Sequence, residues 1–557
     1  MSQHPQKSAE VTAAPSATAT SAWSSLRYPV FRNLWLVTVV SNVGSWMFNA
    51  ASGWLMTSLD PSPLTVSLVQ VANSLPLFLF ALPAGAVADL IDKRRVILVL
   101  EILTTVFSAL FALLLTLHAI TPGVLLIFIF LVGSLAALET PAWQAIVPLL
   151  VPQPALSSAV AVNSVGVNIS RVLGPALTGV VIVGLGIAAP FWLDAFSNLG
   201  VIAVIWWWCP PAPPARTLPA EQLTRAIRAG LRYARNNPQL RATLARSIGF
   251  FLFASAYWAL LPVVARNQLH GGAALYGVLL GAIGAGAVGG AFALPGLKAR
   301  AGADGVVIVG EIGNAAALIL FGLAQEAGTA LLACLIAGAA WIAVLASLNV
   351  SAQVALPEWV RGRGLAVYVT VFFGTMTLGS ALWGLLADRI GLPAAHFAAG
   401  VGALLAMLAT RRWKLHSGPE ADLTPSMHWP EPVLATAVEG DAGPVLVTVE
   451  YHVVPENRAA FLASLARLGR ERRRDGAYSW QVFQDTAHPE RVIETFLVDS
   501  WLEHLRQHRR VTKADRLVED HVNHLVRDPP RVTHFIAAEV RPIARPQQPA
   551  HPAQPHE

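Results

Sequence analysis

Three ionisable side chains stand inside long apolar segments, where an isolated charge is costly. Glu139, Arg171 and Asp194 each interrupt a run of aliphatic and aromatic residues. Such a group costs several kcal/mol in a membrane unless it is paired or hydrated, and it typically marks an ion or proton pathway. Glu139 and Arg171 flank the turn expected at Pro154 at similar separations, so at about 1.5 Å per residue their depths differ by roughly 3 Å. The sequence therefore predicts a Glu139–Arg171 charge pair that carries a proton, with Asp194 nearer the opposite face.

Two further acids and a set of polar side chains complete the intramembrane candidates. Glu101 and Glu311 occupy equivalent positions near the ends of two segments. We interpret them as gate or packing partners of loop arginines, with proton carriers as the alternative. Other polar and aromatic residues can line a cavity, although a helix–helix hydrogen bond or an interfacial anchor is the ordinary role of each. These cavity candidates are Asn42, Trp46, Asn49, Asn163, Asn168, Tyr257, Trp258, Asn349 and Gln353.

A short charged motif follows the second apolar segment. Gly85 ends that segment, Asp89 supplies an acid, and Lys93, Arg94 and Arg95 form a basic cluster about one helical turn later. These groups can latch one helix end to its neighbours through charge-assisted hydrogen bonds. We expect the motif to act as a gate that controls conformational switching. Simple anchoring at the membrane surface is the alternative role of the basic cluster, and both roles can hold.

The segment that carries Arg171 also contains a candidate hinge formed by Gly174, Pro175 and Gly179. Proline removes a backbone donor and kinks a helix, whereas glycine lets a neighbouring helix approach closely. An ordinary kinked membrane helix accounts for the same three residues, so both interpretations stay open.

About twelve membrane-spanning helices are needed to position these residues. Of the 557 residues, 54% are hydrophobic and only 13% are charged, whereas soluble domains carry about 25% charged residues. The apolar runs also recur at the length of about 20 residues that crosses a bilayer. They cover residues 33–58, 64–88, 96–118, 122–148, 156–184, 190–208, 242–267, 274–297, 304–325, 328–356, 363–387 and 393–413. We predict an all-α polytopic membrane protein.

The distribution of basic residues predicts how the chain is oriented. Cytoplasmic loops are enriched in Lys and Arg, so the formal charge of +6 indicates membrane topology, and we expect no nucleic-acid partner. One set of loops holds Lys93, Arg94, Arg95, Lys298, Arg300, Arg361, Arg363, Arg411, Arg412 and Lys414. The other set has mainly Arg266 and Arg389, beside Asp60, Glu326 and Asp388. The first set is therefore assigned to the cytoplasm, together with both termini.

The two halves of the apolar region resemble each other, as in transporters built from repeats. Matching stretches recur in order at nearly constant offsets: Val96–Ile102 with Val306–Ile312 at 210, Phe80–Pro83 with Phe292–Pro295 at 212, and Gln144 with Gln353 at 209. We therefore predict two six-helix repeats. The expected domains are a disordered N-terminus at 1–26, bundles at 27–208 and 242–414, a cytoplasmic linker with a basic amphipathic helix at 209–241, a proline-rich linker at 415–443, a soluble domain at 444–540 and a disordered tail at 541–557.

The C-terminal region predicts a small α+β domain. Residues 444–451 alternate as a strand, a helix follows over 455–474, and strands are expected at 478–485 and 491–498. A second helical region at 500–525 and a closing strand at 531–539 complete the order. This order resembles the ferredoxin-like half of a dimeric α/β barrel, as in antibiotic-biosynthesis monooxygenase-type domains. We expect a homodimer through this domain, with the alternating Val445, Val447 and Val449 on the face that the second copy buries.

The histidines of this region are the remaining chemical candidates. His504 and His508, and likewise His521 and His524, lie about one helical turn apart, which is a spacing that can hold a metal. No acidic or cysteine ligands accompany them, and we interpret both pairs as a solvated helix face. Trp480 and Trp501 are expected to be structural aromatics, with a ligand pocket as the alternative. We expect no metal site and no cofactor.

The motifs resemble the major facilitator superfamily. Gly85 to Arg95 is similar to that family's signature after its second helix, with Asp92 in place of a glycine and Leu90 in place of an arginine. Gly174 to Gly179 resembles the Gly-Pro pattern of its antiporters. Asn33–Trp35, Ser41–Trp46 and Arg171–Pro175 narrow the resemblance to the transmembrane secretion effector group, which includes siderophore exporters of the enterobactin type.

This resemblance implies a non-enzymatic secondary active transporter in the bacterial inner (plasma) membrane. It implies proton-driven efflux of a small organic molecule such as a siderophore, a drug or a secondary metabolite. An importer of the same superfamily and a membrane-tethered monooxygenase or sensor acting through the C-terminal domain remain as alternatives. The sequence has no Walker-type phosphate loop, which argues against an ATP-driven pump.

Overall fold

The computed structural model describes residues 23–90, 92–208, 223–415, 422–430, 438–440 and 442–538, without the side chains of 85–90 and 223–226. The chain forms two compact units, a helical one of Met1–Ala234 and Pro238–Glu420 and a smaller one of Ala421–Glu557 together with Arg235–Asn237. Each is described by itself.

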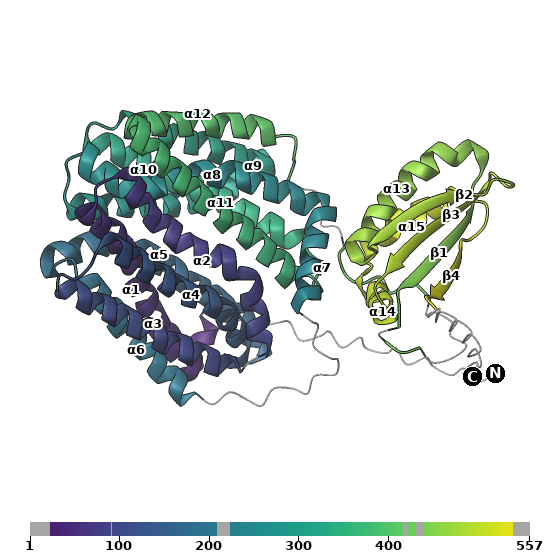
Figure 1. Ribbon diagram of the computed structural model, residues 1–557, viewed down its shortest axis with the longest axis horizontal. Coiled ribbons are helices and arrows are strands. Elements are labelled where there is room, and N and C mark those ends of the chain that lie inside the picture. The colour runs from purple at the N-terminus through teal and green to yellow at the C-terminus, as the bar shows by residue number, and fades with distance from the viewer. Residues whose placement is uncertain are drawn as a thin grey trace, which may run out of the picture. The chain divides into compact units, whose positions relative to one another are not determined.

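The first unit is a bundle of long helices (Figure 1). Within the described residues, ten of its helices are long and apolar enough to cross a membrane, judged by length and composition. The helices are α1 (Pro29–Leu59), α2 (Pro63–Leu90), α3 (Lys93–Thr116), α4 (Pro122–Leu150), α5 (Leu156–Leu185), α6 (Ala189–Trp207), α7 (Leu223–Asn236), α8 (Pro238–Val263), α9 (Ala273–Leu323), α10 (Ala327–Val354), α11 (Arg361–Ile390) and α12 (Leu392–Thr410).

Local sequence explains where several of these helices begin and end. Asp92 caps α3 by accepting a hydrogen bond from the backbone N–H of Arg95, and Thr121 caps α4 in the same way through Val124. Gly186 and Gly391 follow α5 and α11 with φ values of 88° and 86°. Only glycine adopts this left-handed backbone without cost, so both helices stop there.

Helix α9 differs from the prediction. The sequence predicted two spans with a loop around Lys298 and Arg300, but the helical assignment runs for 51 residues through both. At about 1.5 Å per residue this is more than twice the thickness of a bilayer core. Gly302, with φ 67° and ψ −178°, interrupts the helix and divides it into two. The two predicted spans are therefore present as the two parts of this helix, and the break between them lies at Gly302 rather than in a longer loop around Lys298 and Arg300.

Contacts between helices divide the bundle into two sets. Helix α1 packs against α5 and α6, and α3 packs against α4 and α6, whereas α9 packs against α10 and α12. The two sets meet where α2 lies along α11 and where α5 lies along α9.

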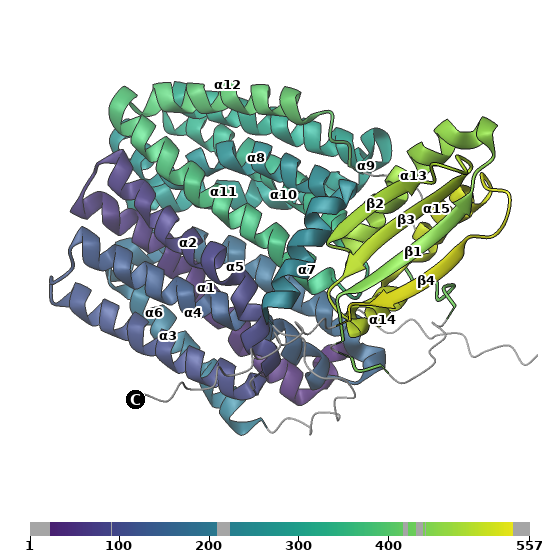
Figure 2. The same ribbon diagram turned by 45° about the vertical axis from the view of Figure 1, so that its right-hand side comes forward.

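The second unit is a small α+β domain (Figure 2). Its elements are β1 (Val445–His452), α13 (Arg458–Asp475), β2 (Ser479–Gln484), β3 (Arg491–Val498), α14 (Trp501–Arg510), α15 (Lys513–Asn523) and β4 (Arg531–Ile536). The antiparallel sheet has the order β2-β3-β1-β4. The elements follow the order expected from the sequence.

The sheet of this domain has one covered face. Val445, Val447 and Val449 are at most 4% exposed and belong to a core with Phe461 and Leu465 of α13. The prediction that these valines face a second copy is therefore wrong, because helices of the same chain already bury them. The opposite face carries Leu446 and its register partners Leu497 and Phe535, and Phe535 is 52% exposed.

Candidate functional site

A cavity of about 220 Å³ lies within the first set of helices, between α1, α2, α3, α4 and α6. Its lining is unusually polar for the interior of an apolar bundle. The polar lining residues are Thr38, Ser41, Asn42, Ser45, Asn49, Asn73, Glu101, Thr104, Glu139, Thr140, Trp143, Asp194 and Asn198. Asn42 and Asn49 are two of the cavity candidates identified in the sequence.

Three carboxyl groups from three helices meet in this cavity. Glu101 of α3 is 7% exposed, Glu139 of α4 is 8% exposed and Asp194 of α6 is 1% exposed. Glu101 has both other acids as its electrostatic neighbours, and its carboxyl group shares a hydrogen bond with that of Glu139. A hydrogen bond between two carboxyl groups needs a proton on one of them. The arrangement is therefore chemically suited to holding a proton.

Hydroxyl and indole donors hold the carboxyl groups in place. Ser45 and Ser108 donate to the two carboxylate oxygens of Asp194 at 3.0 and 2.7 Å. Trp143 Nε1 donates to Glu139 Oε1 at 2.7 Å, one turn along α4. Gly44 allows α1 to approach α6, since a Cβ there would stand 2.9 Å from the Asp194 Cα. Neutral donors rather than bases therefore surround the acids.

Arg171 does not join this cavity. Its guanidinium lies over the Trp46 ring, 5.6 Å from the ring centroid, and its buried Nε has no hydrogen-bond partner. In the described part of the chain no ion pair connects it with Glu139. The structure thus places Glu139 with Glu101 and Arg171 with Trp46, although the sequence matched Glu139 and Arg171 in depth.

The remaining predicted cavity residues lie elsewhere. Tyr257 Oη and Trp258 Nε1 are buried in the second set of helices without hydrogen-bond partners. Asn168 is exposed and donates to the Ser164 carbonyl of its own helix. Asn163, Asn349 and Gln353 lie outside the cavity of the acids.

The gate motif is described only in part. Gly85 and Asp89 belong to α2, but their side-chain surroundings lie outside what the structure describes. Arg94 donates to the carbonyls of Ile205 and Trp206 at the end of α6, where a cation favours the helix dipole. Lys93 and Arg95 stand in the first turn of α3. The motif therefore ties the start of α3 to the end of α6.

The hinge residues provide close helix contacts. A Cβ at Gly174 would stand 2.5 Å from the Trp46 Cβ, and one at Gly179 would stand 2.6 Å from the Ala273 carbonyl oxygen. Pro175 lies inside α5. Gly174 therefore brings α5 against α1, and Gly179 brings α5 against α9 of the other set.

The two helix sets are joined at the end of the bundle that holds Asp388. Arg266 donates to Thr57 Oγ1 at 3.2 Å and to Ser58 Oγ at 2.7 Å. Ser62 donates to Asp388 Oδ1 at 3.0 Å. Arg266 belongs to a π-helical turn, Val264–Gln268, and such turns are frequent at functional sites. We call this set of contacts the Arg266 latch.

Sequence reasoning missed a second buried cluster. Arg246 of α8 is 1% exposed and lies 3.8 Å from Glu311 Oε2 and 3.9 Å from Asp304 Oδ1, both of α9. Both Glu311 carboxylate oxygens and the Asn314 amide lack hydrogen-bond partners. Arg246 stands near the start of an apolar segment, so it resembled an ordinary membrane flank in the sequence. Its partner Glu311 is the acid that was expected to bind a loop arginine.

The histidines of the α+β domain also differ from expectation. His504 is 1% exposed, so its assignment to a solvated helix face is wrong, whereas His521 and His524 are exposed. Trp480 Nε1 donates to the buried Glu494, and Trp501 belongs to the core.

Comparison with known families gives one match that covers most of the chain. A family model described as "Transmembrane secretion effector" matches residues 20–542. The chain is 26% identical over 241 residues to a staphyloferrin A transporter of Staphylococcus aureus, covering 43% of this chain and 60% of that protein. It is 25% identical to the multidrug efflux pump Tap of Mycolicibacterium fortuitum, covering 66% of this chain and 91% of that protein. It is 26% identical to the enterobactin exporter EntS of Citrobacter koseri, and the match covers 68% of this chain and 90% of that protein.

Solved structures share the fold at low sequence identity. A transporter of the POT family in complex with a thioalcohol-conjugated peptide has a TM-score of 0.56 at 13% identity and covers 68% of this chain and 94% of that chain. A mutant of the nucleoside transporter NupG has a TM-score of 0.56 at 11% identity, and the match covers 69% of this chain and 99% of that chain.

Proposed function

The chain belongs to the transmembrane secretion effector family and is a multi-span transporter of the major facilitator type, and from this premise we propose that it exports a small organic molecule in exchange for protons. The three carboxyl groups in the cavity of α3, α4 and α6 carry the proposal. Glu101 and Glu139 share a hydrogen bond, Asp194 accepts hydrogen bonds from Ser45 and Ser108, and the described residues that line the cavity include no basic side chain. A site of this kind gains and loses protons without losing an ion-pair partner.

The size of the cavity supports protons and water, rather than the exported molecule, as its proposed occupants. Pockets for drug-sized ligands occupy about 300–1,000 Å³, whereas this cavity is about 220 Å³. A water molecule has a share of about 30 Å³ in the liquid, so several waters fit beside the acids. Glu139, Glu101 and Asp194 are then the proton-coupling residues, and Arg171 is placed outside the coupling site.

The substrate class follows from the relatives. The compared proteins are named as transporters or exporters of staphyloferrin A, enterobactin and drugs. A siderophore, drug or secondary metabolite is therefore the proposed substrate. We take the Arg266 latch to be the periplasmic gate of a twelve-helix protein in the bacterial inner membrane, with both termini in the cytoplasm. The latch is then closed in an inward-facing state.

The α+β domain is proposed to pair two copies of the transporter. The uncovered sheet face carries Leu446 and Leu497 with the half-exposed Phe535. A second copy in the same orientation would cover this apolar face. The element order supports the likeness to a dimeric α/β barrel, with an assembly role rather than catalysis.

Proton coupling is tested by neutralising the shared pair. The substrate is first identified by comparing secreted metabolites of a strain that lacks the gene with those of the complemented strain. Glu139→Gln and Glu101→Gln should then abolish transport driven by a pH gradient in proteoliposomes, while exchange of labelled substrate continues. Glu326→Gln, which changes an exposed carboxyl group before α10, is the matched control. Full pH-driven transport by both cavity variants would refute the assignment.

A further inference from the structure

A group of three histidines in the α+β domain has no place in the transport mechanism. His504 and His508 lie one turn apart on α14, and His534 comes from β4. In the sheet, His534 is the register partner of the core residue Val447, so its ring faces the helices. Nitrogen atoms of the three rings all lie within 4.8 Å of one another. Two segments of the fold thus deliver three imidazoles to one point.

The distances fit a metal ion. Nε2 of His504 and Nε2 of His508 are 3.2 Å apart. Two imidazole nitrogens bound at about 2.0–2.1 Å to a tetrahedral zinc ion are separated by about 3.3–3.4 Å. A hydrogen bond between the two rings explains this one distance but gives His534 no role. We propose that His504, His508 and His534 bind one divalent transition-metal ion of the zinc class and leave a fourth coordination position open.

A buried amide beside the histidines supports this site. His504 Nδ1 and both amide atoms of Gln507 are buried and make no hydrogen bond of regular geometry, although the two side chains interact with each other, and Gln507 is 0% exposed. Metal ligation through Nε2 puts the remaining proton of His504 on Nδ1, where the neighbouring Gln507 carbonyl oxygen accepts it. Ligand histidines usually make this second hydrogen bond.

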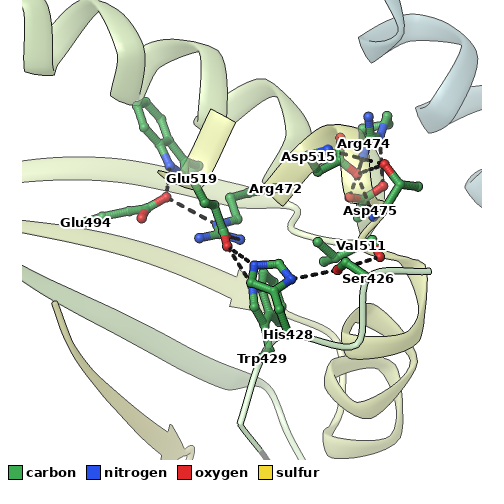
Figure 3. A network of polar contacts seen from close by, with 12 residues as sticks. Ser426, His428, Trp429, Arg472, Arg474, Asp475, Glu494, Val511, Asp515 and Glu519 are labelled. Carbon is green, nitrogen blue, oxygen red and sulfur yellow. Dashed lines mark hydrogen bonds and ion pairs between the residues drawn. The ribbon is translucent and has the colours of Figure 1, made fainter. Parts of the chain in front are cut away.

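Aromatic rings enclose the site and a buried network fixes one of them. The ring centroids of Trp429 and His508 are 5.0 Å apart and their planes meet at 88°. The ring centroids of Trp501 and His504 are 5.4 Å apart. Trp429 Nε1 donates to Glu519 at 2.9 Å, and His428 Nε2 lies 2.6 Å from the same carboxylate oxygen (Figure 3). Residues 426–429, expected to be part of a linker, therefore form a fixed wall beside the histidines.

The charges around the site tolerate a cation. Arg472 lies between Glu519 at 2.6 Å and Glu494 at 3.5 Å, so two carboxylates face one guanidinium (Figure 3).

Metal binding is tested on the full-length protein in detergent, prepared without a histidine tag. After removal of metal with a chelator, the protein is titrated with Zn²⁺, and bound zinc is counted after dialysis. Co²⁺ in place of Zn²⁺ reports the geometry through its visible absorption. We expect one ion per chain with the spectrum of tetrahedral Co²⁺. His508→Ala and His534→Ala should each weaken Zn²⁺ binding at least tenfold.

A matched control separates this site from surface histidines. The double variant His521→Ala/His524→Ala removes two exposed histidines of the same domain and should leave stoichiometry and affinity unchanged. Hydrogen exchange of the β1 and β3 amides verifies that His508→Ala and His534→Ala, both at partly exposed positions, keep the fold. Absence of stoichiometric zinc in the unaltered protein overturns the proposal. Equal affinity in the control and in the folded cluster variants overturns it as well.

Discussion

Substitution of Gly179 by alanine should shift the transporter away from the state described here. The new Cβ would stand 2.6 Å from the Ala273 carbonyl oxygen and 3.0 Å from the Gly277 Cα. Both atoms belong to backbone, so no side chain can turn aside. Ordinary contact begins at 3.4 Å, and the gap between 2.6 and 3.4 Å requires α5 and α9 to separate locally by about 0.8 Å. Overpacking of this kind costs about 1–3 kcal/mol.

That cost acts only where α5 and α9 touch. Opening the Arg266 latch relieves it, so the ratio of open to closed forms should rise about 5- to 150-fold, since 1.4 kcal/mol is a factor of ten. The assay is electron paramagnetic resonance between spin labels at Val183 and Ile390, which are both exposed near this end. Gly184→Ala is the matched control on α5, because a Cβ there meets nothing within 4 Å. Identical label distances in the two alanine variants would refute the reasoning.

Two further predictions concern buried charges. Arg246→Met leaves the Glu311 carboxylate in the bundle without its cation and should destabilise the protein by about 3–5 kcal/mol, measured by thermal unfolding in detergent. The double variant Arg246→Met/Glu311→Met should recover most of this loss of stability. A double variant that is no more stable than Arg246→Met would contradict the pairing. Burial raises the pKa of Glu471 from 4.5 to about 8, so the protonated form of this side chain is favoured in the folded domain. The free energy of unfolding should therefore fall by up to about 1.4 kcal/mol per pH unit as the pH rises between these two values. Glu471→Gln should abolish that slope in the hydrogen exchange of β1 amides, whereas an unchanged slope would assign the pH dependence to another group.

The sequence predicts the depth of a residue in the membrane and the type of secondary structure better than it predicts the direction in which a side chain points. The strands and helices of the C-terminal domain follow from alternation and helical spacing, and their order agrees with the structure. Glu139 and Arg171 were matched in depth, but rotation about each helix axis decides which side chains meet. That rotation depends on packing with α3 and α6, which brings Glu101 and Asp194 to the same cavity.

The histidine group shows the same limit. His504 and His508 are recognisable as a pair because a helix repeats every 3.6 residues. His534 joins them only through the pairing of β4 with β1. The local sequence does not predict the register with which an edge strand such as β4 pairs with its neighbour. Arg246 was overlooked for a different reason, since a basic residue near the start of an apolar segment is ordinarily a surface anchor.

All three cavity acids belong to one half of the bundle, and this placement limits how a proton can influence the conformational cycle. Helices α3 and α6 are joined by the bonds of Arg94 to the Ile205 and Trp206 carbonyls, so Glu101 and Asp194 move together when the halves rock. In the proposed proton exchange, their mutual distances hardly change between states, and access to water from either side of the membrane changes instead. Under that proposal the linkage between protonation and conformation arises from the hydration free energy of the carboxyl group. We therefore expect variants that alter water entry at α1 or α2 to uncouple transport as effectively as removal of an acid.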